Sequence, residues 1–206
     1  MGLIANANMI GWILIASGIV FILSFIFLAL MFSTKRSPWG PMNDVSYVIA
    51  LVLIIPALLG FYMDLRSDFP AASLTAAGLG ITGILIITVT QMRLVFRNIA
   101  FDLNLRQGAF GSGLLGIAFI VLHLLVAKNE MITAGIRWLG LASGFLLAFG
   151  IPTGLFYGKE ELAMTTGELD WKSANKLAIL SIMGAFIGQV GLIAWVFWLG
   201  IFLISL

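Results

Sequence analysis

Residues Met9–Phe32 read MIGWILIASGIVFILSFIFLALMF, a long apolar stretch without a charged side chain. A helix needs about 20 mostly apolar residues to cross the hydrocarbon core of a bilayer, and this stretch is long enough. Because backbone groups in lipid must find their hydrogen bonds within the protein, a continuous apolar stretch of this length predicts a membrane-spanning helix. The fold class then depends on whether the rest of the chain repeats the pattern.

The composition of the whole chain agrees with that first stretch. Hydrophobic residues make up 61% and charged residues only 10% of the 206 residues, whereas soluble domains carry about 25% charged residues. We predict membrane spans at residues 9–32, 45–63, 71–91, 108–127, 138–157 and 174–206. The sequence therefore predicts an all-α integral membrane protein, a bundle of six transmembrane helices with short loops, in a single domain over residues 1–206.

The basic residues are unevenly divided between the two sides of these spans. Eight fall on one side, namely Lys35, Arg36, Arg93, Arg97, Arg106, Lys159, Lys172 and Lys176. Three fall on the other side, namely Arg66, Lys128 and Arg137. The positive-inside rule places the more basic side in the cytoplasm, so both termini are predicted to be non-cytoplasmic. We expect a multi-pass protein of a cell membrane, the inner or plasma membrane of a bacterium or archaeon.

Three arginines follow the third predicted span: Arg93, Arg97 and Arg106. The first interpretation treats them as part of this topology signal. The second interpretation rests on helical spacing, which would place Arg93, Arg97 and Asn104 on one face of an amphipathic segment that extends span three or lies in the headgroup layer. That arrangement predicts a site for anionic lipid headgroups at Arg93, Arg97 and Arg106.

Several kinds of chemistry lack the residues that they need. No Asp, Glu, Lys or Arg falls in the middle of a predicted span, which counts against proton pumps and most ion-coupled transporters. The chain contains no Cys, so thiolate metal sites and thiol catalysis are excluded. No basic tail suggests nucleic-acid binding. We predict a protein that is not an enzyme, has no metal site and requires no cofactor.

The chain has one histidine, His123, toward the outer end of the fourth predicted span. One histidine cannot provide both axial ligands of a bis-histidine haem, and it cannot hold zinc without other donors. Two alternatives stay open. His123 is either a structural residue that hydrogen-bonds a neighbour, or a single axial ligand of a haem or chlorin.

Few polar residues lie within the spans. Gln189, near the middle of the last span, is costly to expose to lipid and is expected to face another helix. Two prolines, Pro56 and Pro152, are expected to kink their helices. Because broken helices can line substrate sites, we predict a possible ligand site at Gln189, Pro152, Thr153 and Ser143.

Glycines recur at four-residue spacing, as at Gly150, Gly154 and Gly158 in span five. This spacing lets helix backbones approach closely, either within the bundle or between subunits. Three functions follow as hypotheses. The first is a non-catalytic subunit or scaffold, with other membrane subunits or a second copy as partners besides the bilayer. The second is a small-solute or lipid transporter, or a lipid-binding protein. The third is an electron-transfer or pigment-binding subunit that uses His123.

Overall fold

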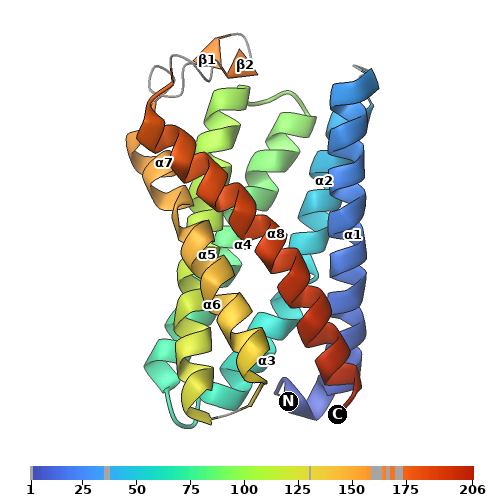
Figure 1. Ribbon diagram of the computed structural model, residues 1–206, viewed down its shortest axis with the longest axis vertical. Helices are drawn as coiled ribbons and strands as arrows, with labels where there is room; N and C mark the ends of the chain where they lie inside the picture. The colour runs from blue at the N-terminus through green and yellow to red at the C-terminus, as the bar shows by residue number, and fades with distance from the viewer. Residues whose placement is uncertain (1, 35–37, 130, 159–163, 166–167, 170–173) are drawn as a thin grey trace.

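The computed structural model describes residues 2–34, 38–129, 131–158, 164–165, 168–169 and 174–206. These residues are helical apart from a short antiparallel strand pair (Figure 1). The helices are η1 (Ile4–Asn6), α1 (Ala7–Thr34), α2 (Trp39–Val52), α3 (Ile55–Leu65), α4 (Pro70–Val95), α5 (Phe101–Asn129), α6 (Ala134–Ala148), α7 (Gly150–Phe156) and α8 (Lys176–Ile204). The strands are β1 (Met164–Thr165) and β2 (Glu168–Leu169).

Six helical segments are long and apolar enough to cross a membrane. They are η1 with α1, α2 with α3, α4, α5, α6 with α7, and α8. The prediction of a helical bundle with six helices long and apolar enough to span a membrane is confirmed. Both termini lie at one end of the bundle, and the strand pair lies at the opposite end (Figure 1), as an even number of spans requires.

The loop predicted between the first two spans is wrong at residues 39–44, which are helical. Helix α2 begins at Trp39, so the polar residues Asn43 and Asp44 belong to its second turn. The helix tolerates Pro38 and Pro41 because both lie at its first turn, where a missing backbone N–H leaves no bond unmade. A carboxyl group therefore lies inside a helix of the bundle, where a loop was predicted.

The predicted amphipathic segment through Arg93, Arg97 and Asn104 is also wrong. Helix α4 ends two residues before Arg97, whose φ of 58° is left-handed. The chain turns there through two backbone bonds, from Arg97 N–H to the Leu94 carbonyl at 2.9 Å and from Asn98 N–H to the Arg93 carbonyl at 2.7 Å. This bond pair is a Schellman motif, which ends a helix. Asn104 consequently belongs to the next helix, α5. That helix begins at residue 101, seven residues before the predicted start of span four.

Both predicted proline interruptions are present. Helices α2 and α3 are separated at Leu53–Ile54, and α3 then carries Pro56 in its first turn. Helices α6 and α7 are separated at Phe149, and α7 carries Pro152 in its first turn. In each case the proline lies in the first turn of the new helix, where a backbone N–H is not needed for a helical hydrogen bond.

Glycines form the closest helix crossings. The crossings are α4–α5 at Gly83 and Gly111, α5–α6 at Gly116 and Gly144, and α1–α8 at Gly11 and Gly200. At each one, a Cβ on one glycine would overlap the carbonyl oxygen of the other. Gly150 and Gly154 of α7 pack in the same way against the backbone of α5. The glycine spacing thus serves packing within this chain.

Helix α8 crosses the bundle diagonally, from α7 at one end to α1 at the other (Figure 1). Its 29 residues extend about 44 Å at 1.5 Å per residue, and the hydrocarbon core is only about 30 Å thick. The diagonal course lets α8 contact α1, α6 and α7 along its length. One helix therefore packs against both halves of the bundle.

Candidate functional site

Three small adjoining cavities meet at Gln189 of α8. Their volumes are about 130, 110 and 130 Å³, and Gln189 lines all three. Six other polar side chains line at least one of them: Ser24, Asn43, Tyr47, Gln91, Asn104 and Ser112. We call these three cavities together the polar chamber. Its walls come from α1, α2, α4, α5 and α8.

The polar chamber occupies one half of the bundle. Gln189 lies near the middle of α8, whereas Asn43 lies in the second turn of α2 and Asn104 in the first turn of α5. The chamber therefore extends from mid-bundle toward the end that carries the strand pair (Figure 1). By the predicted topology this is the cytoplasmic half.

Hydrogen bonds hold part of the chamber wall in place. Ser24 Oγ donates to Asn43 Oδ1 at 2.9 Å and so joins α1 to α2. Asn43 Nδ2 donates to Asp44 Oδ1 at 3.0 Å. The side chains of Tyr47 and Ser112 hydrogen-bond each other and join α2 to α5. These bonds orient polar side chains from three helices toward a shared space.

Two chamber oxygens have no partner within the described residues. They are Oε1 of Gln91 and Oδ1 of Asn104, and both are buried. A buried polar group that lacks a hydrogen bond costs about 1–3 kcal/mol. Cavities of this size with polar walls hold water, so a water or another small polar molecule can supply the missing donors. The two amides form the part of the chamber best prepared to bind a ligand.

Gly108 of α5 also lines the chamber. An ideal Cβ placed on Gly108 would meet no atom within 4 Å. This glycine therefore leaves open space, unlike the glycines at the helix crossings. A side chain introduced here would enter the chamber without displacing the backbone.

An aromatic cluster fills the interior of the bundle on the side of Gln189 that faces away from the polar chamber. Its members are Phe61, Phe119, His123 and Trp195, all at most 1% exposed. We call it the aromatic plug. Trp195 Nε1 donates to His123 Nε2 at 2.8 Å, and His123 Nδ1 donates to the Phe119 carbonyl at 2.7 Å. Both ring nitrogens of His123 are thus engaged, and the ring of Phe119 packs edge-on against Trp195 at 4.6 Å between centroids.

The structure places only one of the predicted ligand-site residues at the chamber. Gln189 lines it, whereas Ser143 donates to the Leu139 carbonyl of its own helix at 2.7 Å. Thr153 is fully buried, with Oγ1 unpartnered, and Pro152 precedes it in the first turn of α7. Neither of these two residues lines the chamber.

The other polar residues around Gln189 were not predicted from the sequence. Tyr47, Gln91, Asn104 and Ser112 come from three different helices. Each lies near a span end or in a mixed segment, where polar residues are ordinary. A usable signal was present only in the amides Gln91 and Asn104, which resemble Gln189 in being hard to hide in lipid.

The three arginines of the predicted headgroup site lie at the end of the molecule opposite the termini. Arg93 and Arg97 are exposed, at the end of α4 and in the turn after it. Arg106 lies in the second turn of α5, and its buried Nε has no partner in the described part of the chain. The structure keeps the three within one helix–turn–helix segment.

Within the described part of the chain, no group of three or more His, Asp or Glu side chains could hold a metal ion. Comparisons with protein-family models, curated proteins and solved structures give no match for this chain.

Proposed function

We propose that this protein binds a small, neutral, polar solute in the polar chamber and passes it across the membrane. The observation that carries the proposal is the pair of buried, unpartnered oxygens on Gln91 and Asn104, beside a polar cavity within the spans. Lipid offers these oxygens no hydrogen-bond donor, so a polar solute or water in the chamber is the partner that suits them.

The walls favour a neutral solute. The polar side chains that line the chamber carry hydroxyl and amide groups, its other described lining residues are apolar, and none of the described lining residues is charged. An ion placed there would lose its hydration without gaining a counter-charge, which is costly. Each cavity of 110–130 Å³ equals about four water volumes, at about 30 Å³ per water. Molecules the size of urea or glycerol fit that space.

Passage requires the aromatic plug to open. Gln189 and Trp195 lie on the same helix, so a change in the tilt of α8 would move a chamber residue and a plug residue together. Hinges are available at Leu53–Ile54 and at Phe149, where the second and fifth spans are interrupted. Movement of this kind around a fixed site is the usual way in which small transporters alternate access.

The test is solute flux into liposomes that contain the purified protein. Swelling after a urea or glycerol gradient is followed by stopped-flow light scattering. The wild-type protein is expected to exceed protein-free liposomes. Gly108→Leu, which fills the chamber, should reduce the rate at least tenfold. Gly78→Leu is the matched control, because a Cβ at Gly78 also meets nothing within 4 Å but lies outside the chamber.

Equal rates for wild-type protein and Gly108→Leu would refute the chamber as the route. A rate for wild-type protein no higher than that of empty liposomes, for a panel of neutral solutes, would refute the transport proposal. Both variants are compared at equal incorporation, so a loss of protein cannot imitate a block.

The other two hypotheses stay predictions. The hypothesis of a subunit or scaffold role rested on the glycine faces. The glycines of the helix crossings, however, meet other helices of this chain. A pigment role would require His123 Nε2 to leave Trp195, since that nitrogen already accepts a hydrogen bond. Neither has an observation comparable to the unpartnered oxygens of the chamber.

A further inference from the structure

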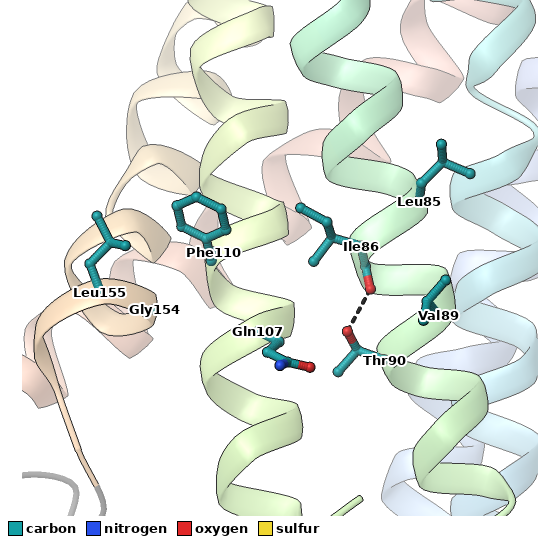
Figure 2. Close-up of a pocket in the computed structure, with 8 residues that line it drawn as sticks. All are labelled: Leu85, Ile86, Val89, Thr90, Gln107, Phe110, Gly154 and Leu155. Atoms are coloured by element: carbon teal, nitrogen blue, oxygen red, sulfur yellow. Dashed lines mark hydrogen bonds between the residues drawn. The ribbon is translucent and has the colours of Figure 1, made fainter. Parts of the chain in front are cut away.

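A large hollow lies on the outer surface of the bundle, between α4, α5 and α7. It has a volume of about 510 Å³. Its walls are mainly apolar, from Leu85, Ile86, Val89, Phe110 and Leu155, with Thr90, Gln107 and Gly154 completing them (Figure 2). We call it the lateral groove. Because it opens sideways from helices that cross the membrane, its surroundings are the acyl chains of lipids.

The lateral groove is separate from the polar chamber. On α4 the groove uses Leu85 and Val89, whereas the chamber uses Ile87 and Gln91. At 100° per residue these pairs lie on opposite faces of the helix. The groove and the chamber have no lining residue in common. The groove is therefore a second site, independent of the proposed transport function.

Polar groups gather at one end of the groove. Figure 2 shows Thr90 of α4 and Gln107 of α5 on the two sides of the same space. The Thr90 hydroxyl already donates to the Ile86 carbonyl of its own helix, at 2.5 Å. Gln107 is partly exposed, so its amide group faces an open position at this end.

Two arginines flank that polar end. Arg93 follows Val89 by four residues and Thr90 by three, so it continues the groove face of α4, and it is exposed. Arg106 directly precedes Gln107, and its buried Nε has no partner among the described residues. The carbonyl oxygen of Arg106 packs beside Gly154 in the groove wall. A phosphate placed at the polar end would therefore meet donors from both α4 and α5.

The length of the groove matches one leaflet. From Leu85 to Arg93 the helix rises about 12 Å, and half of the hydrocarbon core is about 15 Å. Arg93 lies in the last turn of α4, and basic residues at the end of a span reach the headgroup layer. An acyl chain that fills the groove would thus carry its phosphate to the level of the arginines.

We propose that the lateral groove binds one acyl chain of an anionic phospholipid, whose phosphate is held by Arg93 and Arg106. The apolar walls account for the chain, and the two guanidinium groups account for the charge. Arg97 lies in the turn beyond Arg93 and adds a third positive charge at the same level. The headgroup site expected from the arginines is thereby extended by a groove that binds the acyl chain of the same lipid.

The test counts bound lipids by native mass spectrometry of the detergent-purified protein. The probes are phosphatidylglycerol and phosphatidylcholine with identical acyl chains. Wild-type protein should retain phosphatidylglycerol in preference to phosphatidylcholine. Each basic residue near an anionic lipid contributes about 1 kcal/mol, which is about fivefold in affinity. Arg93→Gln with Arg106→Gln should therefore weaken phosphatidylglycerol binding roughly 25-fold.

Matched controls separate the site from general charge. Arg66→Gln removes an exposed arginine at the opposite end of the bundle and should leave binding unchanged. Val89→Trp fills the groove from a position that is 57% exposed, and should reduce binding of the chain. Leu74→Trp, at 59% exposed on the same helix but outside the groove, should not.

Three results would overturn the proposal. The first is equal retention of the two lipids by wild-type protein. The second is unchanged phosphatidylglycerol binding in both the double arginine variant and Val89→Trp. The third is displacement of the lipid by millimolar inorganic phosphate, which would make the arginines a soluble-phosphate site with no contribution from the acyl chain.

Discussion

Gly83 of α4 and Gly111 of α5 meet so closely that a Cβ on Gly111 would lie 2.7 Å from the carbonyl oxygen of Gly83. The polar chamber and the lateral groove lie on opposite faces of this helix pair, mostly between the crossing and the chain turn at Arg97. This one contact therefore fixes the wall that separates the two sites.

Replacing Gly83 with Ala should destabilise the protein by about 1–3 kcal/mol, because the methyl group would overlap the backbone of α5. Gly78→Ala on the same helix should have no such effect, since the space beside Gly78 is open. Thermal unfolding in detergent measures both. Equal melting temperatures for the two variants would contradict the close crossing.

Trp195→Phe should lower stability by about 1–3 kcal/mol. The variant leaves His123 Nε2 buried without a donor, and an unmet buried acceptor costs that much. Trp138→Phe removes the same atoms from a side chain that is 64% exposed, and should be nearly neutral. If the two variants unfold at the same temperature, the bond between Trp195 and His123 does not stabilise the bundle.

Asn104→Leu should separate stability from function. Asn104 is 6% exposed and its Oδ1 has no partner, so an apolar side chain of similar size should raise the melting temperature or leave it unchanged. Solute flux through the chamber should fall at the same time. A marked loss of stability would instead make Asn104 a structural residue.

Arg97→Gly should stabilise the turn after α4. The left-handed conformation at Arg97 costs a residue with a Cβ atom about 1–2 kcal/mol of stability. Glycine avoids this cost because it has no Cβ. Arg97→Ala removes the same charge but keeps the unfavourable conformation, so it should gain nothing. Chemical unfolding of the two variants distinguishes relief of this strain from an effect of charge.

The predicted orientation can be tested by labelling, because the chain has no Cys of its own. Single cysteines are introduced at Ser205, near the C-terminus, and at Asn98, in the turn between α4 and α5; both positions are exposed. A membrane-impermeant maleimide should label Ser205→Cys in intact cells, and Asn98→Cys only after lysis. The reverse pattern would invert the topology.

The sequence by itself determined the membrane class and the six apolar spans. Both follow from local composition, since about 20 apolar residues suffice to cross the core whatever the neighbours do. Pro56 and Pro152 also marked the interrupted spans correctly, because a missing N–H acts within its own turn. The end of α4 at Arg97 escaped prediction, since its left-handed turn is usually made by glycine.

Only the tertiary structure decided which polar residues share a site. Tyr47, Gln91, Asn104 and Gln189 lie on four different helices. Their meeting depends on how each helix is rotated and tilted, which the glycine crossings set. In a membrane protein the lipid-facing and buried sides of a helix are both apolar, so sequence periodicity marks the faces only weakly. For this reason Gln189 could be predicted from the sequence as a candidate site residue, whereas the chamber around it could not.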